Sequence, residues 1–362
     1  MTTRRNFVRD VGVAAGLAFC GCTMLDMAGA QQSGGRRLPV TVNGKRVKTI
    51  DVHAHCLFDE AVALMGSDMP APSRVQGAER QHIAIEQRLK EMDAMAIDME
   101  VLSINPFWYR KDRDSAAQIV KLQNEKLAEL CAAQPERFAA FASLALQFPD
   151  LAVEQLEHAV KRLGLRGAAI GGNVVGTDFS DAKFHPVWAK AEELGAVLFI
   201  HPQSTPELAK RFQGNGWLAN TIGNPLDTTI ALQHLIFEGT LDRFPGLKIL
   251  AAHGGGYFPS YAPRSDHACF VSPANCNAEI SLKKKPTEYL KQLYFDALVF
   301  TPEALRHLAA QVGTSQIMLG SDHPFPWEEH PVDHVFATDA LSDDDKIAIL
   351  GGNAARLFGM KA

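Results

Sequence analysis

Cysteine is scarce in this sequence and forms no metal-binding or disulfide-rich pattern. Six cysteines occur among 362 residues, with no CxxC pair, so a dense disulfide framework is excluded. Cys20 and Cys22 lie in the first 30 residues, a segment that we interpret below as removable. Cys269 and Cys276 could pair in an oxidising compartment, although nothing in the sequence requires it.

Long hydrophobic runs and clusters of one charge are also missing. The formal net charge is -5, and no block of Lys and Arg, alone or interleaved with aromatic residues, suggests a nucleic-acid surface. The moderately apolar run at residues 11–24 is shorter than the ~20 residues of a membrane-spanning helix. We see no internal repeat and no long low-complexity tract. The 46% of hydrophobic residues suffices for the core of one large α/β barrel or of two ordinary domains.

The N-terminus resembles a twin-arginine export signal. Arg4 and Arg5 precede a polar residue and Phe7, and small residues at 28–30 have the spacing that a signal peptidase prefers. We therefore expect residues 1–30 to be a signal peptide and the protein to be periplasmic or otherwise exported. The alternative is a frayed N-terminal helix in a cytoplasmic protein, and a lipoprotein site at Cys22 fits its flanking residues poorly.

Residues 31–46 are polar and are expected to be a linker or extended arm, and the remaining residues 47–362 alternate between strand-like and helix-like patterns. Short apolar runs predict strands at 47–50, 99–104, 138–144, 167–170, 196–200, 248–252, 293–299 and 317–321. Amphipathic spacing predicts helices at 83–95, 114–133, 151–163 (capped by Asp150), 186–194, 226–241, 302–310, 343–350 and 354–358. Eight such units predict a (β/α)8 TIM barrel, with an open doubly wound sheet as the alternative.

Residues that bind metals or move protons follow four of these strands. His53 and His55 follow the first strand, and alternate residues of an extended chain point the same way. His201, His253 and Asp322 close the fifth, sixth and eighth strands, and the carboxyl ends of barrel strands meet at the active-site face. A catalytic zinc usually keeps protein ligands and an exchangeable water, whose proton a neutral histidine can accept. The alternative is a set of unrelated core histidines with backbone partners.

These motifs together resemble the amidohydrolase superfamily. The resemblance rests on the HxH pair, on His201 before Pro202, on His253 before three glycines and on the Gly-Ser-Asp-His-Pro-Phe-Pro stretch at residues 320–326. Within the superfamily they look like the branch of aminocarboxymuconate-semialdehyde decarboxylase and related metal-dependent, non-oxidative decarboxylases. The resemblance implies a TIM barrel of the metal-dependent hydrolase type and covers nearly all of residues 47–360.

The resemblance also implies the roles of individual residues. One divalent ion, commonly zinc with manganese as the other possibility, would be held by His53, His55, His201 and Asp322. His253 would be the acid/base, assisted by Asp322. Residues 167–173 contain no lysine, which agrees with a site for one metal ion instead of two.

Substrate binding is expected to involve arginines. Arg264 matches a family arginine that binds the substrate carboxylate across a dimer interface, so the resemblance implies a homodimer, and Arg80 is a second candidate. Two residues depart from the family pattern. Gln203 stands where a tryptophan is frequent, and Ser272 replaces an arginine.

We therefore expect a decarboxylase that acts on an unsaturated or aromatic carboxylic acid, a small-molecule carboxylate. The alternative is a hydrolase of an amide, ester, lactone or C–C bond that uses the same metal ligands. A non-catalytic binding protein on a barrel scaffold has no evident use for an intact metal set with an acid/base.

Overall fold

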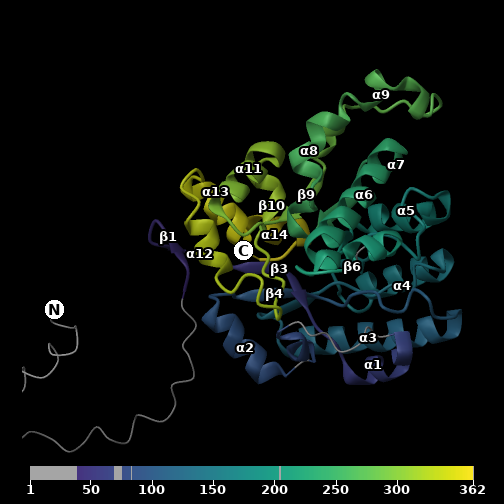
Figure 1. The fold of residues 1–362 in the computed structure, drawn as a ribbon. Helices are drawn as coiled ribbons and strands as arrows, with labels where there is room; N and C mark the ends of the chain where they lie inside the picture. Colours follow the sequence, from purple (N-terminus) through teal and green to yellow (C-terminus); the bar gives the residue numbers. More distant parts are fainter. Residues whose placement is uncertain (1–38, 69–75, 83, 204, 362) are drawn as a thin grey trace, which may run out of the picture. The chain divides into compact units, whose positions relative to one another are not determined.

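Parallel strands form the centre of the structure, a computed structural model that describes residues 39–68, 76–82, 84–203 and 205–361 (Figure 1). Nearly all of their residues are buried, as expected for parallel strands that are covered on both faces. In the described part of the chain they are eight in number: β3 (Ile50–His55), β4 (Met99–Ser103), β5 (Phe138–Ala140), β6 (Gly167–Ile170), β7 (Val197–Ile200), β8 (Lys248–Ala251), β9 (Leu293–Asp296) and β10 (Ile317–Met318).

The strands close into a barrel. One run of paired strands is β3-β4-β5 and the other is β6-β7-β8-β9-β10. A parallel bridge between Ala142 and Ala168 joins β5 to β6. On the other side, the Val52 N–H donates to the carbonyl of Leu319 at 2.9 Å, and Ala54 bridges His323 in parallel. The (β/α)8 prediction is thus confirmed, because an open doubly wound sheet would leave two unpaired edges.

Helices surround the strands (Figure 1), and most were predicted to within a few residues. The helices that match a prediction are α2 (Ile85–Ala94), α3 (Arg113–Ala133), α4 (Pro149–Lys161), α5 (His185–Leu194), α6 (Asn224–Phe237), α11 (Pro302–Val312), α13 (Asp343–Ile347) and α14 (Asn353–Phe358). Short helices without a prediction lie in the connections: α1 (Asp59–Met65), α8 (Phe258–Ser265), α9 (Ala268–Val271), α10 (Pro286–Tyr289) and α12 (Pro331–Phe336). The short helix α7 (Thr240–Arg243) overlaps the end of the predicted helix at 226–241. None of the helices in the described ranges combines the length and apolar character needed to cross a bilayer.

Several local predictions differ from the structure. The first strand contains the HxH pair, because pairing with β4 continues as far as His55. The expected helix at 226–241 is divided between α6 and α7 at Gly239, whose φ of 72° is left-handed and ends a helix. Asp150 does not cap α4, because this helix already begins at Pro149 and Asp150 lies in its first turn.

The segment before the barrel is partly a hairpin. Strands β1 (Thr41–Val42) and β2 (Lys45–Arg46) pair antiparallel, in a stretch that the sequence suggested to be a linker or arm. The predicted signal peptide lies outside the described residues.

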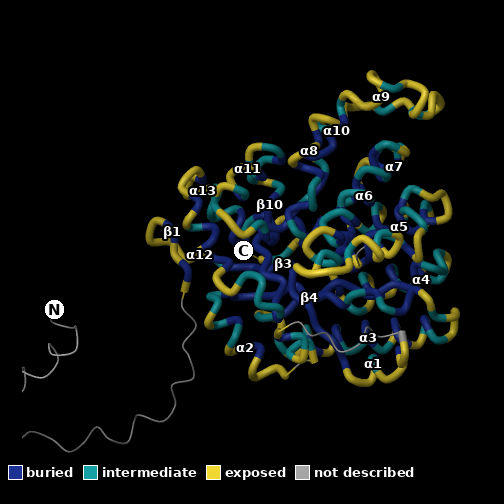
Figure 2. The backbone as a smooth tube through the Cα atoms, viewed as in Figure 1, coloured by how far each residue is buried: buried dark blue, intermediate teal, exposed yellow. Residues whose placement is uncertain are grey.

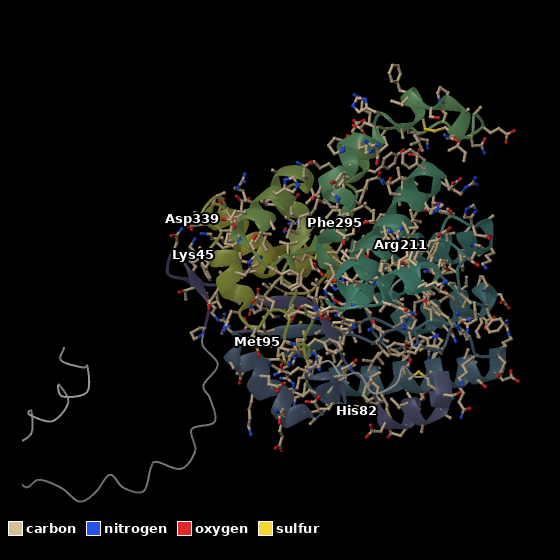
Figure 3. All side chains as sticks on the ribbon, viewed as in Figure 1. Lys45, His82, Met95, Arg211, Phe295 and Asp339 are labelled. Atoms are coloured by element: carbon tan, nitrogen blue, oxygen red, sulfur yellow. A yellow bond between two sulfur atoms is a disulfide. The ribbon has the colours of Figure 1, made fainter. Side chains whose placement is uncertain are left out.

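The hydrophobic core has two layers, one between strands and helices and one inside the barrel. Figure 2 shows the central strands as the most continuously buried part of the chain. Inside the barrel, the rings of Phe141 and Phe199 stack with centroids 5.3 Å apart. Phe199 also lies 5.1 Å from the ring of His53. Phe295, labelled in Figure 3, is fully buried on β9 and packs in the outer layer. The ring of His53 thus packs directly against the aromatic layer inside the barrel.

A lobe that contains α9 extends beyond α8 (Figure 1). Cys269 and Cys276 form a disulfide in it, with Cα atoms 5.7 Å apart (Figure 3), so the pairing that the sequence left open is present. Phe270 and Val271 are 85% and 75% exposed there. The lobe therefore presents apolar surface to solvent.

Candidate metal centre

The four residues predicted to hold a metal ion converge at the carboxyl ends of the strands. His53 and His55 lie on β3, His201 follows β7 directly, and Asp322 follows β10. All four are buried, and each offers a ligand atom within 4.8 Å of the others. Their donor set of three imidazoles and one carboxylate suits zinc or a similar divalent ion.

Hydrogen bonds to the outer ring nitrogens orient the two strand histidines. Asp296 accepts from His53 Nδ1–H at 2.7 Å. Ser103 Oγ donates to the Ala54 carbonyl at 3.1 Å and therefore accepts from His55 Nδ1–H at 3.0 Å. When the two rings are neutral, Nδ1 therefore carries the proton in each, and each Nε2 directs a lone pair toward the centre.

These lone pairs meet at short distances. The Nε2 atoms of His53 and His55 are 3.2 Å apart, and Asp322 Oδ1 lies 3.3 Å and 2.9 Å from them. Electron-rich atoms this close together need a proton or a metal cation between them. The positions of these three ligand atoms therefore fit a bound metal ion.

His201 supports the same fit. Its ring is buried, yet neither ring nitrogen has a hydrogen-bond partner. A buried polar group without a partner is rare and costly. Burial first, and then the neighbouring histidines His55 and His53, hold the pKa of His201 well below its usual range. Its ring is therefore neutral at physiological pH and has lone-pair density to offer a cation.

The electrostatics of the cluster also favour a cation. Burial opposes ionisation of Asp322, but His53 and the hydrogen bonds of the surrounding histidines hold the pKa of Asp322 well below its usual range. Burial likewise opposes charge on His53, but Asp322 and Asp296 together raise the pKa of His53 to about 10. The negative charge that favours a proton at His53 would equally favour a divalent ion.

Asp296, at the end of β9, organises the centre and was given no role in the sequence analysis. Besides the ring of His53, its Oδ2 accepts from the backbone N–H of His253 at 2.9 Å, and its Oδ1 accepts from that of Gly254 at 2.8 Å. Its place at the end of a barrel strand was the signal in the sequence that could have found it. Gly320 packs against it so closely that a Cβ there would lie 2.8 Å from the Cβ of Asp296.

His253 lies beside the four-residue cluster and is more accessible than its members. Its Nε2 is 3.9 Å from Asp322 Oδ2, and its side chain is 15% exposed. Its ring centroid is 5.2 Å from that of His201. The left-handed backbone of His253, with a φ of 56°, directs the side chain there. A histidine in this position can exchange protons with both solvent and a molecule bound at the centre.

Ionic contacts support the strand ends from behind. Arg88 Nε donates to Glu100 at 2.6 Å, and its Nη1 donates to the carbonyl of His55 at 2.9 Å. His323 bonds Glu100 through Nδ1 at 2.7 Å and Glu91 through Nε2 at 3.0 Å. Burial opposes the charge on Glu100, but Arg88 and His323 lower its pKa to about 2. This network fixes the backbone next to His55 and Asp322.

The predicted substrate arginines lie in different surroundings. Arg80, in the 3-10 helix Ala78–Gln81, donates to Glu91 at 3.0 Å and so joins the network through His323. Arg264 is exposed on α8, and within the described residues no hydrogen bond or ion pair is found for its guanidinium. The structure therefore brings neither guanidinium into the cluster within one chain.

The two residues that depart from the family pattern also have defined places. Ser272 is half-buried in the lobe. Gln203 has an exposed side chain, and its backbone N–H donates to Asp227 at 3.0 Å. Asp227, which the sequence analysis overlooked, also accepts from Asn173 at 3.0 Å, and burial raises its pKa to about 6. Through these two hydrogen bonds Asp227 links the loop that follows β6 to the loop that follows β7.

Comparison with known proteins gives consistent matches over the barrel. A family model described as amidohydrolase matches residues 50–360. A 2-amino-3-carboxymuconate-6-semialdehyde decarboxylase from Dictyostelium discoideum is 33% identical over 276 residues, which cover 75% of this chain and 76% of the relative.

Solved structures match as well. The 5-carboxyvanillate decarboxylase from Sphingomonas paucimobilis has a TM-score of 0.80 and 26% identity, over 87% of this chain and 100% of the other. A dihydroxybenzoic acid decarboxylase from Polaromonas sp. JS666, solved with manganese and 2-nitroresorcinol, has a TM-score of 0.77 and 28% identity, over 86% and 97% of the two chains. The matches span the strands that carry the candidate centre.

Proposed function

The chain belongs to the amidohydrolase family, and on that premise we propose that it is a metal-dependent carboxy-lyase. It removes CO2, without oxidation, from an unsaturated or aromatic carboxylic acid. The observation that carries the proposal is the convergence of three imidazoles and one carboxylate beside a more accessible histidine. The relatives named above, all decarboxylases, support this reaction over the hydrolysis that other members of the superfamily perform.

The ion would be held by His53, His55, His201 and Asp322, and when bound it supplies positive charge that binds and orients the substrate carboxylate. We propose zinc as the native metal because the donor set is rich in imidazole. Manganese is the alternative, supported by the solved decarboxylase that contains it. Metal analysis of protein purified without added metal distinguishes the two.

His253 would supply the proton in the reaction. The bond between the substrate carbon and its carboxylate breaks, the electron pair stays on carbon, and the proton from His253 adds there as CO2 leaves. Asp296 holds the backbone of His253 in place, and Asp322, 3.9 Å away, stabilises the protonated imidazole. Solvent access allows the ring to be reprotonated for the next cycle.

The test is release of CO2 from candidate acids by the metal-loaded protein. The candidates are 2-amino-3-carboxymuconate 6-semialdehyde, 2,6-dihydroxybenzoate and 5-carboxyvanillate. We expect CO2 from at least one of them. The His253→Ala variant should lose at least a hundredfold in rate, a typical contribution of general acid catalysis, while keeping its metal. A fully loaded protein that hydrolyses an amide, ester or lactone and releases no CO2 would contradict the proposal and favour the hydrolase.

The protein would act as a homodimer in which Arg264 binds the substrate carboxylate of the partner subunit, and Arg80 is a second candidate for substrate binding. Exposure of Arg264 on α8, beside the apolar lobe, supports this arrangement. A mixture of Arg264→Ala and Asp322→Ala proteins should regain activity that each lacks alone, because one site in the mixed dimer is intact. Absence of regained activity, with dimers present, would contradict a role across subunits.

Export is also part of the proposal. Residues 1–30 would act as a twin-arginine signal and deliver the folded, metal-loaded enzyme to the periplasm. A fusion of these residues to a reporter should be exported, and the Arg4→Lys/Arg5→Lys fusion should stay in the cytoplasm. Export of both fusions, or of neither, would contradict the signal.

A further inference from the structure

The third histidine of the centre lacks the support that the other two have. The rings of His53 and His55 are each held at Nδ1, by Asp296 at 2.7 Å and by Ser103 at 3.0 Å. Within the described residues, neither ring nitrogen of His201 has a hydrogen-bond partner. Its ring meets that of His55 edge-on, with centroids 4.5 Å apart. The backbone of His201 must therefore set the direction of its ring.

That backbone is constrained on both sides of His201. On the side of β7, the His201 N–H donates to the carbonyl of Ile170, at the end of β6, at 2.9 Å. On the other side, Pro202 has no N–H, and its ring restricts the conformation of the residue before it. The first backbone donor after His201 is therefore the N–H of Gln203, which donates to Asp227 Oδ2 at 3.0 Å. This bond fixes the direction in which the chain leaves His201.

The carboxylate of Asp227 is itself held in place. Asp227 lies in the first turn of α6 and is 2% exposed. Its Oδ1 accepts from Asn173 Nδ2 at 3.0 Å, and Asn173 Oδ1 accepts from the N–H of Gly176 at 2.8 Å. A Cβ at Gly172 would lie 2.2 Å from Asp227 Oδ2, so the carboxylate lies directly against the backbone after β6. It is thus fixed between the two connections that it joins.

The chain keeps this carboxylate buried at a cost. In the described part of the chain no ion pair is found for Asp227, and its donors are one backbone N–H and one amide. Burial of an unpaired carboxylate is unfavourable, and it raises the pKa of Asp227 to about 6. A neutral amide would be easier to bury, but it would turn an NH2 group toward one of the two donors. Two acceptor oxygens are therefore what this position requires.

The start of α6 supports a second connection, which carries no candidate ligand. Thr229 Oγ1 accepts from the N–H of Tyr257 at 2.8 Å and donates to the carbonyl of Pro225 at 2.7 Å. Tyr257 lies four residues after His253, in the connection that follows β8. Thr229 therefore resembles Asp227 in its place on the helix and in its backbone partner, and it differs in the strand end that it supports.

We infer that Asp227 is a positioning residue of the metal centre, which directs the ring of His201 toward the ion by holding the N–H of Gln203. Asp227 is not one of the four candidate ligands and acts through His201. The inference rests on the metal ion that the proposed function requires, and it does not depend on which reaction follows.

The test is Zn2+ affinity of the full chain, measured against a competing chelator. In Asp227→Asn we expect the dissociation constant to rise by about tenfold to a hundredfold, the usual effect of losing a partner behind a metal ligand. Asn173→Asp should also weaken binding, because two carboxylates would then face each other.

The double variant Asp227→Asn/Asn173→Asp should recover about tenfold of the lost affinity, a typical coupling within one hydrogen-bond network. The amide at position 227 can donate to the carboxylate at position 173 and still accept from the N–H of Gln203. The carboxylate at position 173 can still accept from Gly176. All three hydrogen bonds of the wild type are thus possible, with the same total charge.

A matched control and a second measurement separate positioning from stability. Thr229→Val removes hydrogen bonds at the same end of α6 and should change the Zn2+ dissociation constant by less than about twofold. The visible absorption of Co2+-loaded protein reports the coordination geometry. It should change in Asp227→Asn, stay unchanged in Thr229→Val and return to the wild-type spectrum in the double variant. Asp227→Asn with wild-type Zn2+ affinity and Co2+ spectrum but a lower unfolding temperature would show a structural role and overturn the inference.

A double variant that binds Zn2+ no better than either single variant would also overturn it. If Asp227→Asn does not fold, Asn173→Asp and the double variant give the same comparison from the other side. The proposed reaction is judged separately, by CO2 release. The expected pattern of Zn2+ affinities without CO2 release would keep Asp227 and remove the reaction, whereas CO2 release with equal affinities would keep the reaction and remove Asp227. A wild type that binds no Zn2+ would overturn both.

Discussion

At the scale of single residues, the centre depends on carboxylates that lie behind the candidate ligands. Asp296 accepts four N–H bonds: one from the His53 ring and three from the backbone of His253, Gly254 and Leu298. Both of its oxygens are occupied by donors. An amide in its place would necessarily turn an NH2 group toward an N–H.

Asp296→Asn should therefore weaken metal binding by about tenfold to a hundredfold, the usual effect of losing a partner behind a metal ligand. Metal affinity measured against a competing chelator checks this. Asp242→Asn changes a carboxylate that accepts from Tyr289, outside the centre, and should leave the affinity unchanged. Equal affinity in both variants would show that Asp296 does not orient His53.

Acid sensitivity should come in part from Glu100. Its folded pKa of about 2 lies below the ordinary 4.5, so its contribution to stability is full above pH 4.5 and is lost as pH falls toward 2. The difference of about 2.5 pH units corresponds to about 3 kcal/mol, at 1.36 kcal/mol per unit.

Chemical denaturation of chelator-treated protein between pH 7 and pH 3 checks this. Glu100→Gln should be less stable than the wild type at pH 7, because Arg88 keeps its buried charge without a partner. The gap between the two proteins should narrow toward pH 3. A gap that stays constant with pH would contradict the assignment.

At the scale of elements, the inner layer of the barrel links stability to the centre. Phe199 stacks on Phe141 and touches His53. Phe199→Ala should cost about 3–5 kcal/mol of unfolding free energy and should also weaken metal binding, because His53 loses its support.

Phe184→Ala is the matched control, since Phe184 is equally buried but packs against Phe179 and Trp188 in the outer layer. It should lose similar stability and keep its metal affinity. Denaturation and metal titration of both variants decide the matter, and equal metal affinity in the two would refute the link.

The elements also explain what the sequence could and could not predict. His201 and His253 could be placed because each follows a continuous apolar run, and such a run in an α/β chain is a buried strand. Trp217 and Trp327 lie in connections without periodicity, so nothing in the sequence indicated that their rings would stack. The cluster of four ligands could be predicted from the order of the strands alone. The role of Asp296 could not be predicted, because it depends on the direction of the side chain, which sequence spacing does not give.

At the scale of the whole molecule, the four candidate ligands join distant parts of the barrel. They come from β3, β7 and the end of β10, so a bound ion would cross-link strands that are not neighbours in sequence. Because the unfolded chain does not bring these residues together, binding favours the folded state.

Removal of the ion with a chelator should lower the free energy of unfolding by about 4 kcal/mol if the ion is present at a thousand times its dissociation constant. Thermal unfolding with and without chelator measures this. His201→Ala should be insensitive to the chelator. A wild-type protein equally insensitive would mean that the cluster holds no ion.

Closure of the barrel between β10 and β3 also sets an order of events during synthesis. Asp322 donates its backbone N–H to the carbonyl of His53, so the segment after β10 completes the site that β3 begins. A nascent chain therefore lacks one of the four ligands until the segment after β10 has been synthesised. Any ion that needs all four can be acquired only after that segment has closed the barrel.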